Sequence, residues 1–82
     1  MITVSDNNYL NNVWKQWLDA NLDHSSQLNH NYSRVARRIP VAQKFEDWLW
    51  VQGASIIRDN RKCYLQFTNE EDAIIFKLRH GI

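Results

Sequence analysis

The chain has 82 residues and a formal net charge of +1, and this length leaves room for one hydrophobic core and excludes two. Ten lysines and arginines stand against nine acids, which argues against a general nucleic-acid binder but leaves a local basic patch open. The single cysteine excludes an internal disulfide. With no signal-peptide pattern and no apolar run of roughly 20 residues, we expect a cytoplasmic protein that does not enter membranes.

The first predicted element is a helix over about residues 6–21, because apolar residues from Tyr9 to Leu18 recur at helical spacing. Ser5 or Asp6 can cap its start. The polar segment 22–33 has no clear period and is expected to connect two helices. The whole stretch 22–39 is a candidate for a flexible connection.

A second helix is predicted over about residues 40–52, between Pro40, which suits a first helical turn, and Gly53, which suits a left-handed C-terminal cap. Phe45 and its neighbours one turn apart form the stripe expected to face the core. Trp50 points away from this stripe. It is either buried on a second side or an exposed anchor for a partner, and burial is the favoured expectation.

A β-hairpin is predicted from two runs rich in β-branched and aromatic residues, 54–58 and 62–67, with Asp59 and Asn60 as its turn. Cys63 falls on the face assigned to the core, so we expect a buried, inert thiol. A hairpin alone is marginal in water. Residues 2–4 could supply a third strand, or the open hairpin edge could pair with a second copy of the chain.

The last predicted element is a helix that starts after a capping box, in which the Thr68 hydroxyl accepts a hydrogen bond from the Glu71 N–H. Acids in its first turn and cations in its last turn complement the helix dipole, and Gly81 ends it. We expect its apolar stripe to face the core. That stripe consists of Ile74, Ile75, Leu78 and Ile82.

These elements predict a small single α+β domain over residues 1–82, in the order helix, connection, helix, β-hairpin, helix, with a candidate N-terminal strand. The three histidines do not fall at metal-ligand spacings and the cysteine stands alone, so no metal or other cofactor is expected. The serines lie in no nucleophile motif, and both acidic clusters lie near helix starts, where the dipole accounts for them. We therefore expect a protein that is not an enzyme.

The candidate contact residues are a basic segment, Arg34, Arg37 and Arg38, with Lys44 further along the chain. If this segment is helical, its three arginines project from one side and could bind phosphates or an acidic protein surface. The plainer alternative, a solvated segment whose arginines pair with acids of the same chain, is rated somewhat ahead. Trp50 is the second candidate.

The C-terminal half carries a resemblance in three stretches, Phe45–Ala54, Tyr64–Ala73 and Phe76–Arg79. Over about residues 45–79 the chain resembles small uncharacterised accessory proteins of tailed, T4-like phages. The resemblance implies no known activity and assigns no functional residue. It implies a small phage accessory protein, a class whose members often bind and redirect or inhibit a host protein.

The expected function is therefore that of a non-enzymatic protein that binds and modulates, or inhibits, a host macromolecular partner, most plausibly a protein in the host cytoplasm. The alternative is a nucleic-acid-binding module that uses the Arg34–Arg38 basic segment. An enzyme with an unfamiliar site and a subunit of a self-assembly are the remaining alternatives. The expected contacts are Arg34, Arg37, Arg38, Lys44 and Trp50.

Overall fold

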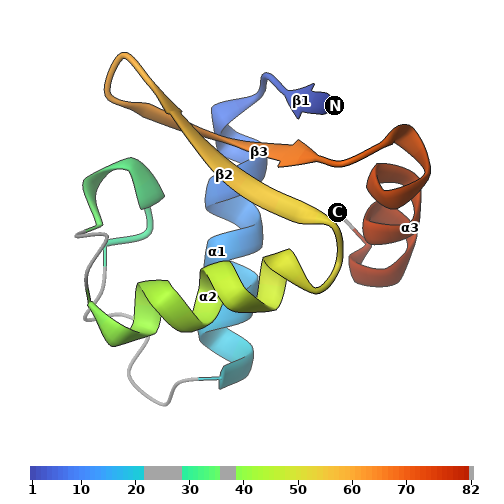
Figure 1. Ribbon diagram of the computed structural model, residues 1–82. Coiled ribbons are helices and arrows are strands. Elements are labelled where there is room, and N and C mark those ends of the chain that lie inside the picture. The colour runs from blue at the N-terminus through green and yellow to red at the C-terminus, as the bar shows by residue number, and fades with distance from the viewer. Residues whose placement is uncertain (22–28, 36–38, 82) are drawn as a thin grey trace.

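The computed structural model describes residues 1–21, 29–35 and 39–81 (Figure 1). Within them the α+β class is confirmed, including the N-terminal strand. Of the expected connection 22–39, residues 22–28 and 36–38 lie outside the described part. The elements in chain order are β1 (Ile2–Val4), α1 (Asn7–Asn21), η2 (Tyr32–Arg34), α2 (Pro40–Trp50), β2 (Ala54–Asp59), β3 (Lys62–Phe67) and α3 (Glu70–His80).

The described strands form one antiparallel sheet in the order β1-β3-β2, so β3 lies between the other two. β1 pairs Ile2 with Phe67, which confirms the predicted third strand. The hairpin turn is one residue later than expected, because Asp59 still pairs with Lys62. The turn residues are Asn60 and Arg61, with φ of 48° and 69°. Two positive φ angles are typical of the tight turn that matches the twist of paired strands.

One face of the sheet packs on α1 and α2, while α3 stands at the end of the sheet (Figure 1). The alternation along β3 decides which side chains enter the core. Cys63, Leu65 and Phe67 are all buried, and the residues between them are not. The predicted buried thiol of Cys63 is thereby confirmed.

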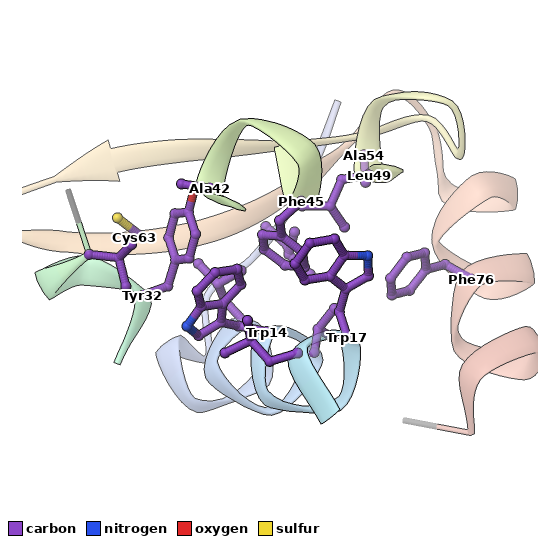
Figure 2. Close-up of a cluster of buried hydrophobic side chains, with 14 of the residues drawn as sticks. Trp14, Trp17, Tyr32, Ala42, Phe45, Leu49, Ala54, Cys63 and Phe76 are labelled. Atoms are coloured by element: carbon purple, nitrogen blue, oxygen red, sulfur yellow. The ribbon is translucent and has the colours of Figure 1, made fainter. Parts of the chain in front are cut away.

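Phe45 of α2 lies at the centre of an aromatic cluster. Its ring centroid is 4.8 Å from that of Trp14, 5.4 Å from those of Trp17 and Tyr32, and 6.0 Å from that of Trp48. Figure 2 shows the rings of Trp14, Trp17, Tyr32 and Phe45 converging between α1, α2 and η2, with Phe76 pointing in from α3. Aromatic pairs at such separations add to the free energy gained by burial. The core of this small domain is therefore built mainly from rings.

The segment that leads into η2 and η2 itself are each held against α1 by one hydrogen bond. The Trp14 indole Nε1–H donates to the Asn29 carbonyl at 2.9 Å, and the Tyr32 N–H donates to Asn11 Oδ1 at 3.0 Å. The Tyr32 side chain is 1% exposed, and burial together with the nearby Glu46 carboxylate raises the pKa of its phenol. A buried ring thus fixes the segment that carries Arg34.

The start of α3 differs from the predicted capping box by one residue. Asn69 is the N-cap, and its side chain accepts from the Asp72 N–H at 2.8 Å. Thr68 lies one residue before the N-cap, and its N–H and its hydroxyl both donate to the Gly53 carbonyl, at 2.9 and 3.3 Å. The acidic first turn, the basic last turn and Gly81, with φ of 67°, are as predicted.

Alanine substitutions should distinguish Asn69 from Thr68 as the N-cap of α3. We expect Asn69→Ala to lower the free energy of unfolding by about 1 kcal/mol, because an exposed helix N–H loses its acceptor. Thr68→Ala should cost less, since the Thr68 hydroxyl makes one long hydrogen bond at an exposed position. Urea denaturation followed by circular dichroism measures both. A larger loss for Thr68→Ala than for Asn69→Ala would restore the predicted capping box.

The predicted apolar stripe of α3 is wrong. Ile74, Ile75 and Leu78 are exposed, at 52, 42 and 79%, and Ile82 lies outside the described residues. The buried residue is Phe76, which is 1% exposed. α3 lies at the end of the sheet, where Phe76 packs into the core in place of the predicted stripe.

Phe76 contacts two rings of other elements, with centroid distances of 5.3 Å to Phe67 and 5.9 Å to Trp48. The C-terminal end of α3 is fastened by His80, whose Nε2 lies 2.6 Å from Gln52 Oε1. Burial and the neighbouring Arg79 lower the pKa of the His80 imidazole. These contacts place α3 beside the end of α2 and leave its isoleucines facing outward.

Candidate functional site

A hollow of about 540 Å³ lies between η2 and the hairpin turn. We call it the basic hollow. Its lining residues are all polar or charged: Asn31, Ser33, Arg34, Arg58, Asn60, Arg61 and Lys62.

The hairpin supplies three of the four cations, and its two-residue turn brings them close together. Arg58 lies near the end of β2, Arg61 is the second turn residue, and Lys62 begins β3. Arg34 comes from the end of η2, more than twenty positions earlier in the chain. Two segments that are distant in sequence therefore contribute to one basic surface.

Two hydrogen bonds through Ser33 hold η2 beside the hairpin. The Ser33 Oγ accepts from the Cys63 N–H at 2.9 Å, and the Ser33 carbonyl accepts from Arg58 Nη1 at 3.4 Å. β1 pairs with β3 only as far as Leu65. The Ser33 hydroxyl therefore satisfies a β3 donor beyond the end of β1 and positions Arg34 next to the turn.

The chemistry of the basic hollow is that of binding. Arginine presents planar sets of N–H donors that match the oxygens of phosphate or carboxylate groups. Among its described lining residues there is no carboxylate, imidazole or thiol that could serve as a general base or nucleophile. The one hydroxyl, on Ser33, already accepts a backbone N–H. This arrangement can hold an anion.

A second surface surrounds Trp50 at the end of α2. The Trp50 side chain is 72% exposed and Val51 is 80% exposed. They adjoin a hollow of about 220 Å³ whose lining residues are Glu46, Asp47, Trp50, Ala54, Ser55 and Ile56. We call these residues together with Val51 the Trp50 surface.

The expected burial of Trp50 is wrong, and the geometry of α2 gives the reason. The helix buries Ala42, Phe45 and Leu49 on the side facing the core. The chain then turns at residues 51–53 and enters β2 directly. No described element returns over the outer side of α2, so Trp50 meets solvent there.

The structure does not bring the predicted contact residues together in one site. Arg34 lies in the basic hollow, Trp50 lies on the Trp50 surface, and Lys44 is exposed and lines neither. Arg37 and Arg38 lie outside the described residues, so their predicted role is untested.

Sequence reasoning missed Arg58, Arg61 and Lys62. Their signal was present, because three cations flank the predicted hairpin turn within five positions. Arg58 and Lys62 fall in the two predicted strands and Arg61 lies between the predicted turn and the second strand, and nothing in the local pattern indicates that the turn lies beside Arg34.

The chain was compared with known proteins in three ways. No protein-family model, no curated protein and no solved structure matches it. The resemblance to phage accessory proteins therefore stays a prediction.

Two general features of the described residues bear on the kind of site. No group of three or more His, Cys, Asp or Glu side chains among them could hold a metal ion. None of the described helices is long and apolar enough to cross a membrane.

Proposed function

We propose that this is a non-enzymatic binding protein that uses the Trp50 surface to bind a protein partner. The observation that carries the proposal is the 72% exposure of the Trp50 side chain, next to Val51 at 80%. Single exposed leucines are common on proteins, but an exposed tryptophan beside another apolar residue and a hollow is typical of an interface anchor. Burying the indole against a partner would remove a large apolar area from water and so favour binding.

The surroundings of Trp50 favour a protein over a nucleic acid. Glu46 and Asp47 line the adjoining hollow and would repel phosphate groups. β2, which supplies the rest of that hollow, has a strand neighbour on one side only, β3, in the described sheet. An extended partner segment could pair with such an edge while an apolar side chain packs on Trp50. Basic residues in that segment would complement the two acids.

The biological role we propose follows the sequence resemblance. In that role the protein is a phage accessory protein that modulates or inhibits a host protein in the host cytoplasm. Its support is the pattern in the C-terminal half, together with a surface suited to protein contact.

The test compares two variants that each remove one exposed apolar side chain. Tagged wild-type protein, Trp50→Ala and Leu78→Ala are incubated with host lysate, and captured proteins are quantified by mass spectrometry. Leu78 is 79% exposed on α3 and serves as the matched control. We expect a partner retained by the wild type and by Leu78→Ala, and reduced about tenfold or more by Trp50→Ala, as for an interface hot spot.

Equal capture by all three proteins would contradict the proposal. Self-association through the same surface would contradict it too. In that case light scattering would show a wild-type dimer that Trp50→Ala converts to a monomer.

A further inference from the structure

We propose that the basic hollow binds the phosphate backbone of a nucleic-acid strand, at a site separate from the Trp50 surface. Arg34, Arg58, Arg61 and Lys62 converge on this hollow, and none of the described residues that line it is acidic. The two surfaces lie at opposite ends of β2. The Trp50 surface uses residues 54–56, and the basic hollow begins at Arg58.

The net charge of the whole chain argues against a general nucleic-acid binder, but the local distribution of charge favours binding at this hollow. The four cations of the hollow exceed the formal net charge of the whole chain, which is +1. The rest of the chain is therefore net negative, while the described lining of the hollow holds four cations and no acid. A locally positive hollow on a nearly neutral protein attracts an anionic polymer to one place and orients it.

The exposure of the cations favours a polymer over a small anion. Arg34, Arg58, Arg61 and Lys62 are all solvent-exposed. A single ion pair between exposed groups contributes only about 0.2–1 kcal/mol, so one phosphate would bind weakly here. A strand that presents several phosphates releases condensed counterions at each contact, which gives a favourable entropy that a small anion does not provide.

The lining residues favour nucleic acid over an acidic protein. Protein interfaces have an apolar or aromatic centre. The described lining of the hollow contains no apolar or aromatic residue. Contacts to a phosphate backbone need only charged and polar donors. Because contacts to the phosphate backbone carry no direct sequence information, we expect little sequence preference.

The asparagines supply neutral donors beside the cations. Asn31 Oδ1 accepts from the Ser33 N–H at 3.1 Å, which leaves the amide nitrogen of Asn31 as the group that can donate to a ligand. Asn60 lines the same hollow from the hairpin turn. Guanidinium groups with neighbouring amides form a mixed donor set of the kind that holds phosphate oxygens.

The test measures binding of the full-length protein to a fluorescently labelled 12-nucleotide single strand of mixed sequence, by anisotropy at 50 to 200 mM salt. For three phosphate contacts we expect the affinity to fall roughly twentyfold over this range, from a slope of about −0.7 per contact. The double variant Arg58→Ala/Arg61→Ala should bind about tenfold or more weakly at 50 mM salt, with a shallower slope.

The matched control removes two cations elsewhere. Lys77→Ala/Arg79→Ala changes the net charge equally, but these residues lie on α3 and do not line the basic hollow. We expect the control to bind within about twofold of wild type. Thermal melting of each variant verifies that it is folded, and Trp50→Ala should leave oligonucleotide binding unchanged.

Three results would overturn the proposal. One is an absence of binding by the wild type at 50 mM salt. Another is an equal loss of affinity in the two double variants, which would indicate that binding depends on net charge alone. The third is equal affinity for polyglutamate of matched charge, which would assign the hollow to acidic protein segments. None of these results depends on the Trp50 surface, so the two proposals fail separately.

Discussion

Phe45→Ala is expected to lower the free energy of unfolding by about 3–5 kcal/mol. Phe45 is fully buried, and its ring contacts Trp14, Trp17, Tyr32 and Trp48. Truncation leaves a cavity bordered by rigid rings from α1, α2 and η2, which cannot all move inward. Small domains are stable by only about 5–15 kcal/mol, so the variant should be partly unfolded at moderate temperature. Urea denaturation followed by tryptophan fluorescence and circular dichroism measures the loss.

Trp50→Ala is the control for this experiment, because it removes a larger ring from the same helix at an exposed position. We expect a change within about 0.5 kcal/mol. Phe45→Leu should fall between the two, since it keeps much of the buried volume. A cost below about 1.5 kcal/mol for Phe45→Ala would show that the core does not depend on this ring.

Much of the fold follows from short-range signals. The alternation through Cys63 in β3 identified its buried face, and Pro40 and Gly53 marked the limits of the second helical segment. Each signal reflects a constraint within a few residues: the two-residue period of a strand, the fixed φ of proline and the positive φ of glycine. The order of the α-helices and of the hairpin was predictable because these elements have such local signals near their ends, whereas η2 was not predicted.

The orientation of α3 could not be predicted in this way. The apolar residues of α3 are distributed around the whole helix, so its sequence does not select one side for burial. Phe76 is the buried residue, and its ring packs against those of Trp48 and Phe67. These partners belong to α2 and β3, so the sequence pattern of α3 alone does not identify the contact.

The basic hollow shows the same limitation. Arg34 was identifiable from its basic neighbours, but its companions Arg58, Arg61 and Lys62 belong to the hairpin. They meet because the Ser33 hydroxyl accepts the Cys63 N–H, a hydrogen bond between residues 30 positions apart. A serine in a polar segment gives no indication of such a partner. The candidate site is therefore a product of tertiary structure, whereas the exposed Trp50 required only knowledge of which side of α2 is covered.

Of the two glycine-to-alanine substitutions that the chain allows, Gly53→Ala is expected to be the more damaging. Gly53 has φ of 78°, a conformation in which a side chain is strained. An added Cβ would also lie 2.8 Å from Asp72 Cγ, too close for two carbon atoms. Strain and overpacking together should cost roughly 2–4 kcal/mol. The Gly53 carbonyl accepts from the Thr68 N–H at 2.9 Å, so any shift of this turn also disturbs the connection to α3.

Two further variants separate strain from collision. Gly81→Ala places a methyl group at φ of 67° with no atom within 4 Å, so it should show only the backbone cost, about 1–2 kcal/mol. Asp72→Ala removes the carboxylate that the new Cβ would meet. If collision contributes, Gly53→Ala/Asp72→Ala will lose less stability than the sum of its single variants, by about 1 kcal/mol or more. Strict additivity would mean that backbone strain alone makes glycine necessary between α2 and β2.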